Sequence, residues 1–163
     1  MVNQILTERL RLHQLDVTEA RALLAGRAHA ERPWIGGYPI EGTMIAAEAF
    51  LRSVASGVDL GPYGMYQIVR RVDAVVVGDI GFHAPPDPSG TVTVGYGLAP
   101  SARGEGYATE ALRAVIDWAL AQPDVRRVEA DTAHGNLASR RVMERAGMRL
   151  VGRSEQLRFY CYP

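Results

Sequence analysis

The stretch from residue 94 to 112, VGYGLAPSARGEGYATEAL, places an apolar strand directly before a glycine-rich turn and a long helix. Gly104 and Gly106 allow the backbone of the turn to approach a ligand closely, because glycine has no Cβ. No proline interrupts residues 103–108, so all six backbone N–H groups are available as donors. At the start of a helix these donors have no partner within the helix, and the helix dipole adds about half a positive charge. The pattern predicts a seat for a phosphate or pyrophosphate group.

The glycine pattern has a simpler interpretation. A helix also uses glycines merely to turn tightly, and the spacing Arg-x-x-Gly-x-Ala at residues 103–108, an instance of (Arg or Gln)-x-x-Gly-x-(Gly or Ala), is short enough to arise by chance. A dinucleotide-binding Rossmann turn is excluded, because the third glycine position is Thr109 and no strand–helix–strand unit precedes it. The turn therefore needs support from the rest of the chain.

Hydrophobic periodicity and turn residues give an order of elements around this stretch. Helices are expected at residues 18–24, 43–53 (with a stripe of Ile45, Ala49 and Phe50), 106–121 and 136–146. Strands are expected at residues 10–15, 65–69, 74–82, 91–98, 125–131, 148–151 and 157–162, with the third and fourth forming a hairpin. This order predicts an α/β (α+β) protein with a single mixed, mostly antiparallel sheet flanked by helices. We expect residues 1–163 to form one domain.

The composition excludes several classes of function. The chain has 163 residues, of which 47% are hydrophobic and 22% charged, as is usual for one globular domain. Its 18 basic residues are all arginine and balance 18 acidic residues, so no large positive field attracts nucleic acid or a membrane surface. Without lysine, Schiff-base catalysis and a P-loop lysine are excluded.

The single cysteine, Cys161, excludes an internal disulfide and a zinc cluster. It is most simply a reduced strand residue, as expected of a cytoplasmic protein. Residues 1–8 lack the basic and apolar regions of a signal peptide, and no apolar run approaches the length of a membrane span. We expect a cytoplasmic protein without a membrane partner.

Two further blocks accompany the stretch at residues 94–112. The run NLASRRVMERAGM at residues 136–148 begins with Asn and ends in Gly and a large apolar residue, and TERLRL occupies residues 7–12. In this order the blocks resemble the GNAT superfamily of acetyl-CoA-dependent N-acetyltransferases, and in particular its ribosomal-protein-alanine N-acetyltransferase subgroup. The likeness extends from about residue 6 to 152. It implies the GNAT-like acyl-CoA N-acyltransferase fold and acetyl-CoA as co-substrate.

The resemblance also implies where the cofactor binds. The pyrophosphate is expected on residues 103–108, and the pantetheine arm on the end of the preceding strand and on Asn136. Ser139 is expected to protonate the departing thiolate, because Met143 occupies the family's usual Tyr position; its simpler role is to cap backbone groups. The implied cofactor-binding residues are Tyr96, Gly97, Leu98, Arg103, Gly104, Glu105, Gly106, Tyr107, Ala108, Thr109, Asn136 and Ser139. No metal is implied.

The general base is where the chain departs from its relatives. They often carry a Glu at the position of Thr93, which cannot accept a proton near neutral pH. His134 titrates in the right range and is expected beside the sulfur end of the cleft. Asp131, Tyr96 and a water relay are the alternatives. The HxxxD pattern at residues 83–87 lies in a proline-rich turn and is not expected to form a site.

The acceptor side is less defined. Trp34 and Tyr38 lie in a loop where the family binds its acceptor, so they are expected either to contact the substrate or to cover the core. The predicted function is acetyl transfer from acetyl-CoA to a primary amine by direct attack, with a protein N-terminus or a small molecule as acceptor. The alternative is a non-catalytic, CoA-binding or regulatory module. The oligomeric state, a homodimer included, is left open.

Overall fold

The computed structural model describes residues 3–163 and contains one eight-stranded sheet, in the order β1-β2-β3-β4-β5-β6-β8-β7. The strands are β1 Gln4–Leu6, β2 Leu10–Gln14, β3 Met65–Arg70, β4 Val76–Phe82, β5 Thr91–Leu98, β6 Arg127–Ala133, β7 Arg149–Arg153 and β8 Leu157–Tyr162. Neighbouring strands pair antiparallel except β5 with β6, which pair parallel. This confirms the predicted mixed, mostly antiparallel sheet.

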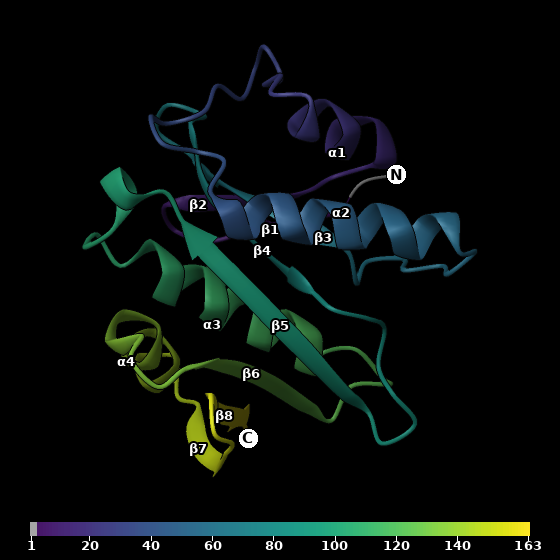
Figure 1. Ribbon diagram of the computed structural model, residues 1–163, viewed down its shortest axis with the longest axis vertical. Helices are drawn as coiled ribbons and strands as arrows, with labels where there is room; N and C mark the ends of the chain where they lie inside the picture. The colour runs from purple at the N-terminus through teal and green to yellow at the C-terminus, as the bar shows by residue number, and fades with distance from the viewer. Residues whose placement is uncertain (1–2) are drawn as a thin grey trace.

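Helices cover both faces of the sheet (Figure 1). They are α1 Val17–Leu24, α2 Glu41–Ala55, the short 3₁₀ helix η1 Pro100–Ala102, α3 Tyr107–Leu120 and α4 Leu137–Arg145. Side chains alternate along a strand, and β3 shows the result: Tyr66 and Ile68 join the core beneath α3, whereas Met65 and Val69 join the core beneath α1 and α2. The predicted helices are all present.

Two details differ from the expectation. β1 was not predicted, because in a three-residue strand only Ile5 is buried and no periodic pattern arises. The stripe on α2 does not face the core: Ile45 is 58% exposed, whereas Thr43 and Ala47 are fully buried. Small side chains bring this helix close to the sheet, and its larger apolar face borders a cavity.

β5 and β6 separate after a short ladder. They pair only at Thr91–Thr93 with Arg127–Glu129, and then β5 stays with β4 while β6 stays with β8. Figure 1 shows the two strands diverging toward α4. Thr93 O accepts from His83 N and Ala99 N donates to Val77 O, each at 2.9 Å. Because backbone groups alternate in direction along a strand, those of Tyr96 and Leu98 face the gap between β5 and β6.

Candidate active site

The glycine-rich turn leads directly from β5 into α3. Gly104 has φ +87° and Gly106, the residue that precedes α3, has φ +80°, a region that residues with a Cβ rarely adopt. No side chain caps the helix, and its first backbone bond runs from Glu110 N to Gly106 O at 3.1 Å. The N–H groups of residues 107–109 therefore have no acceptor within the helix. A Cβ on Gly104 would meet no atom within 4 Å, so the turn is open to a ligand.

Arg9 and Glu110 hold this turn in place. Glu110 accepts hydrogen bonds from Thr7 Oγ1 at 2.6 Å, from Arg9 N at 2.9 Å and from Arg9 Nε at 2.7 Å. Arg9 also donates to Glu105 O at 2.8 Å and lies 4.7 Å above the Tyr107 ring. Partial burial opposes ionisation, but the bonds from Thr7 and Arg9 outweigh it and hold the pKa of Glu110 below its usual value. The turn is thus fastened to the β1–β2 edge.

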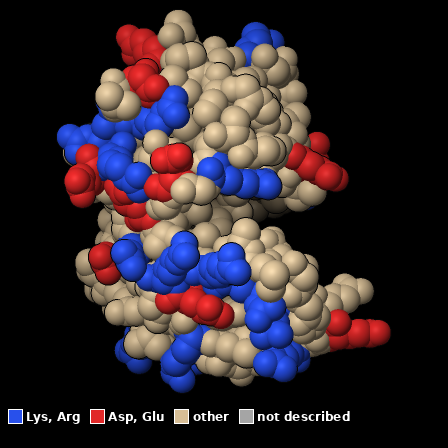
Figure 2. Space-filling model, turned by 90° about the vertical axis from the view of Figure 1, so that its left-hand side faces the viewer, with Lys and Arg blue, Asp and Glu red and all other residues tan. Residues whose placement is uncertain are grey.

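A groove of about 470 Å³ runs between the turn and α4; we call it the cofactor groove. Its wall contains eleven of the residues that the resemblance assigned to the cofactor, which are Tyr96, Gly97, Leu98, Arg103, Gly104, Gly106, Tyr107, Ala108, Thr109, Asn136 and Ser139. Glu105 does not line it. Arg141 and Arg145 add positive charge to the wall, and Figure 2 shows basic side chains gathered across this side of the molecule. The groove is thus chemically suited to an anionic ligand.

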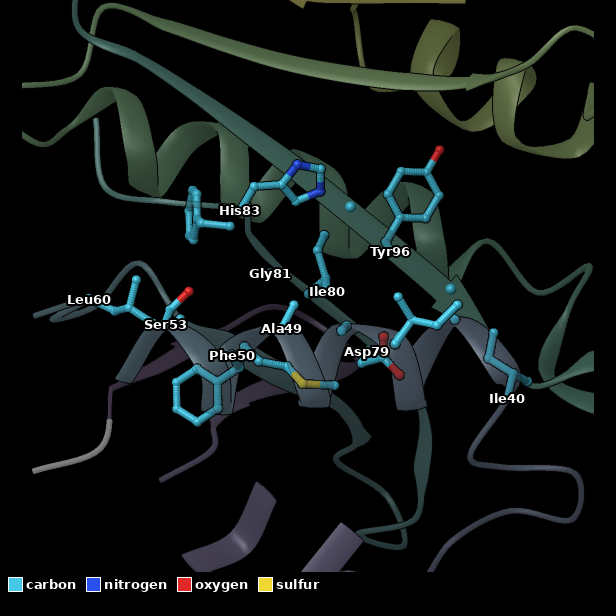
Figure 3. A pocket seen from close by; sticks show the side chains of 18 residues that line it. Ile40, Ala49, Phe50, Ser53, Leu60, Asp79, Ile80, Gly81, His83 and Tyr96 are labelled. Atoms are coloured by element: carbon cyan, nitrogen blue, oxygen red, sulfur yellow. The ribbon is translucent and has the colours of Figure 1, made fainter. Parts of the chain in front are cut away.

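A second cavity, of about 440 Å³, lies between α2, β4 and β5 (Figure 3). We call it the α2 cavity. Most of its lining is apolar, including the α2 side chains Ile45, Ala49 and Phe50; its polar side chains are Ser53, Asp79, His83 and Tyr96. Three residues, Ile40, Tyr96 and Gly97, line both this cavity and the cofactor groove. The two spaces therefore meet at the end of β5.

Tyr96 and Ser139 are paired across the groove. The phenol oxygen of Tyr96 lies 2.8 Å from Ser139 Oγ and also donates to Ser139 O at 3.1 Å. Asn136 Oδ1 accepts from Ser139 N at 3.1 Å, so Asn136, and not Ser139, caps α4. Burial raises the pKa of Tyr96 to about 12, and the phenol is protonated at neutral pH. The pair is a hydroxyl donor facing the groove.

Four of the predicted residues lie elsewhere. His134 lines neither space, because its Nε2 lies 2.9 Å from Ser154 O in the loop before β8. Asp131 is exposed on β6 and lines neither space. Trp34 and Tyr38 pack edge to face at 5.7 Å within the core beneath α1 and α2, where Tyr38 is 6% exposed. The structure thus favours the core-covering role for these aromatic residues and corrects the expected position of His134.

The structure adds two titratable residues to the α2 cavity. Asp79, 6% exposed, lies opposite Gly97 in the β4–β5 ladder and accepts from Thr43 Oγ1 at 2.5 Å. Burial raises the pKa of Asp79 to about 6, although the hydroxyl groups of Thr43 and Tyr38 oppose the rise. Asp79 was not predicted from the sequence, although a carboxylate inside the apolar run AVVVGDIGF is a signal that could have revealed it.

His83 is the second. Its Nε2 lies 3.1 Å from the position that a Cβ on Gly95 would occupy. The HxxxD pattern is still not a site: Asp87 accepts from Ser89 and Thr91 within the hairpin turn, whereas His83 faces the cavity. Within residues 3–163, no group of three or more metal-ligating side chains is gathered, and no helix is long and apolar enough to cross a membrane.

Comparison with known proteins identifies the family. The family model described as "Acetyltransferase (GNAT) domain" matches residues 9–149. "Uncharacterized N-acetyltransferase YjdG" from Bacillus subtilis is 28% identical over 160 residues, which cover 96% of this chain and 95% of that protein.

Solved structures share the fold. An acetyltransferase from Agrobacterium tumefaciens aligns with a TM-score of 0.70 and 24% identity, over 100% of this chain and 95% of that one. RimL, described as a ribosomal L7/L12 alpha-N-protein acetyltransferase in complex with coenzyme A, aligns with a TM-score of 0.70 and 20% identity, over 98% and 97% of the two chains. The sequence match, the fold and the groove agree: the chain belongs to the GNAT family of acetyl-CoA-dependent N-acetyltransferases.

Proposed function

We propose that residues 1–163 act as one domain in which the cofactor groove holds acetyl-CoA and the α2 cavity holds the acceptor amine. The observation that carries this proposal is the meeting of the two spaces at Ile40, Tyr96 and Gly97. A thioester in the groove and an amine in the cavity approach each other only there. Bringing two reactants together in this way supplies much of the rate enhancement in bimolecular transfers.

The groove fits the chemistry of coenzyme A along its length. The free N–H groups at the start of α3 suit the pyrophosphate, and Gly104 and Gly106 leave no Cβ in its path. The backbone groups of Tyr96, which face the gap beyond the β5–β6 ladder, suit the amides of the pantetheine arm. Leu98 O, which faces the same gap, accepts from Arg103 Nε at 3.3 Å, so of Leu98 only the N–H is free for the cofactor. We assign to the Leu98 N–H the polarisation of the thioester carbonyl, as in an oxyanion hole.

Transfer then needs no covalent enzyme intermediate. The amine nitrogen attacks the carbonyl carbon, a C–N bond forms and the C–S bond breaks. The Ser139–Tyr96 pair, joined at 2.8 Å, gives a proton to the departing thiolate. Cys161 is buried in β8 and lines neither space, so it plays no part as a nucleophile.

The amine must be neutral to attack. An α-amino group has a pKa of about 7.7–8.0, whereas that of a lysine side chain is about 10.4. At about pH 7.5 the neutral fractions differ by a few hundredfold. We therefore propose a low-pKa acceptor, either a peptide N-terminus or a small-molecule amine, over internal lysines. The α-N-protein activity in the name of RimL, which shares the fold, is consistent with the first. Free, buried Cys161 suits a reducing compartment, and we propose the cytoplasm.

The test is turnover of acetyl-CoA against a panel of amines at several pH values, with mass spectrometry of the product. We expect N-acetylation of low-pKa amines, with a rate that rises with pH up to the pKa of the acceptor. Efficient acetylation of a peptide lysine over a free N-terminus near pH 7 contradicts the proposed preference. CoA binding without turnover of any amine would instead indicate a non-catalytic, regulatory module.

A further inference from the structure

The α2 cavity contains an unusual electrostatic feature. Asp79 is its only acidic side chain, and no arginine lines it, although the chain has 18 arginines and no lysine. Its other titratable side chains are His83 and the protonated phenol of Tyr96. A buried carboxylate that has no cationic partner loses hydration free energy without compensation. A cation that entered the cavity would therefore be attracted to Asp79.

We propose that Asp79 binds the acceptor as an ammonium ion and takes its proton, and that the preferred acceptor is a primary amine on an apolar body with no anionic group near the nitrogen. This rests on the proposed function of the two spaces. It adds both a proton acceptor, which Thr93 cannot provide, and a substrate class.

Asp79 lies close to the point where the two spaces meet. It lies directly opposite Gly97 in the antiparallel β4–β5 ladder, and Gly97 lines both the cavity and the groove. Directly opposed residues have Cβ positions about 4.5–5.5 Å apart. Ile40, which lines both spaces, occupies the room beside Gly97, with its Cδ1 2.7 Å from the position of a Cβ there. His83 lies next to Gly95, two residues before Gly97 along β5. Figure 3 shows Asp79 on the Ile40 side of the cavity and His83 on the opposite side.

The groups around Asp79 leave its carboxylate free to accept a proton. The groups that face it are Thr43 from α2, Tyr38 from the preceding loop and Gln67 from the neighbouring strand, and none of them is cationic. Thr43 occupies one lone pair of Oδ2, and a carboxylate has about four such acceptor sites. With a pKa of about 6, the carboxylate is ionised at neutral pH and remains able to accept a proton.

The lining of the α2 cavity favours an acceptor with an apolar, uncharged body. The lining by Ile45, Ala49, Phe50 and other apolar residues suits an apolar body. A carboxylate or phosphate on the acceptor would lie near Asp79 with no arginine in the lining to balance it. Repulsion between the two anionic groups would weaken the binding of such an acceptor, whereas an acceptor with a neutral body has no such repulsion.

Every proton that moves in this transfer has a donor and an acceptor. The acceptor enters as R–NH₃⁺ and gives one proton to Asp79, which later releases it to solvent. The neutral amine attacks, and the nitrogen loses a second proton as the amide forms. That proton replaces the one that the Ser139–Tyr96 pair gave to the thiolate, so the products are the amide, the free thiol and one proton.

The experiment compares Asp79→Asn with the parent enzyme over pH 5–9, using leucinamide and leucine as matched acceptors. The asparagine keeps a side-chain oxygen for Thr43 but cannot accept the proton. We expect kcat/KM for leucinamide to fall by at least about 10²-fold and the acid limb near pH 6 to disappear. CoA affinity measured by calorimetry should be unchanged. Asp117→Asn, on an exposed α3 residue that lines neither space, is the matched control and should keep the parent's profile.

Two further measurements separate a catalytic role from a structural one. Thr43→Val removes a hydroxyl that lowers the pKa of Asp79, so the acid limb should move to higher pH. The loss in Asp79→Asn should be smaller for acceptors that are already neutral at the assay pH. Leucinamide should exceed leucine at least tenfold when rates are expressed per neutral amine.

Three results would overturn the proposal: an Asp79→Asn enzyme with the parent's rate and acid limb, an acid limb that disappears only in His83→Gln, or equal use of leucine and leucinamide. These leave acetyl transfer itself intact. Absence of turnover in the parent enzyme with every amine would instead remove the proposed function.

Discussion

The phenol oxygen of Tyr96 on β5 lies 2.8 Å from Ser139 Oγ on α4, so this contact joins β5 to the helix that follows β6, beyond the point where β5 and β6 separate. The hydroxyl predicted to protonate the thiolate is therefore backed by a second hydroxyl. Burial raises the pKa of Tyr96 to about 12, so the phenol stays protonated at neutral pH.

We predict that Ser139→Ala lowers kcat by on the order of 10²-fold while KM for acetyl-CoA changes little, because protonation of the leaving group occurs only in the transition state. Tyr96→Phe should have a similar effect. The double variant should be hardly slower than either single one, because the two hydroxyls act as a unit. Steady-state kinetics measures all three, with circular dichroism as a check on folding. If neither single substitution changes kcat, the pair is only a structural contact.

A side chain added to the glycine-rich turn should weaken the binding of CoA. Gly104→Asn adds a side chain to the turn where the pyrophosphate is expected, at a position where a Cβ meets no atom within 4 Å, and Asn tolerates the left-handed backbone better than most residues. We expect CoA binding measured by calorimetry to weaken at least tenfold, about 1.4 kcal/mol. Gly26→Asn is the matched control: it has φ +75°, follows α1 and has free space around it. Equal weakening in both variants would assign the effect to backbone strain.

Glu110 should stabilise the fold in a pH-dependent manner. Glu110→Gln keeps the shape of the side chain but weakens the bonds from Thr7 and Arg9, and we expect a loss of about 1–3 kcal/mol in unfolding free energy at pH 7. Because the pKa of Glu110 is lowered in the folded state, its stabilisation is present above the ordinary pKa of 4.5 and is lost as the pH falls through the folded value. Denaturant unfolding should show the two proteins converging in acid. Glu48→Gln, on an exposed part of α2, should show no such difference at any pH.

Asp79 should have the opposite effect on stability. Its pKa is raised from 3.8 to about 6, so its favourable contribution is present in full below the ordinary value and is lost as the pH rises through about 6. At about 1.4 kcal/mol per pKa unit, the ionised form costs up to about 3 kcal/mol above that pH. Asp79→Asn should therefore be more stable than the parent at pH 7–8, and the advantage should shrink toward pH 4. A variant that is less stable at pH 8 would show that the carboxylate is needed for folding.

The opposite signs for Glu110 and Asp79 agree with their roles. Glu110 is surrounded by donors, and its charge fastens the cofactor turn to the β1–β2 edge. Asp79 is buried with little to balance its charge, and stability given up at such a position is characteristic of functional residues.

Local sequence was sufficient for the strand, turn and helix at residues 94–112. The turn depends on backbone conformations that glycine adopts easily, and the helix on a 3.6-residue apolar period, and both are properties of neighbouring residues. The same reasoning, joined to the family resemblance, named most of the wall of the cofactor groove, because that wall is largely this one segment and the start of α4.

The acceptor side of the site depends on contacts between residues that are distant in the sequence. The sequence alone did not predict which side chains line it. Trp34 and Tyr38 cover the core, His134 turns toward Ser154, and Asp79 reaches the cavity because the β4–β5 register places it opposite Gly97. A shift of one residue in that register would send Asp79 to the other face of the sheet. The sequence alone determined the cofactor turn and the helices and strands other than β1, through local backbone preferences and hydrophobic periodicity. Only the tertiary structure decided which residues 18 or 43 positions apart lie together. The sheet register places Asp79 opposite Gly97, and the packing of α4 places Ser139 against Tyr96.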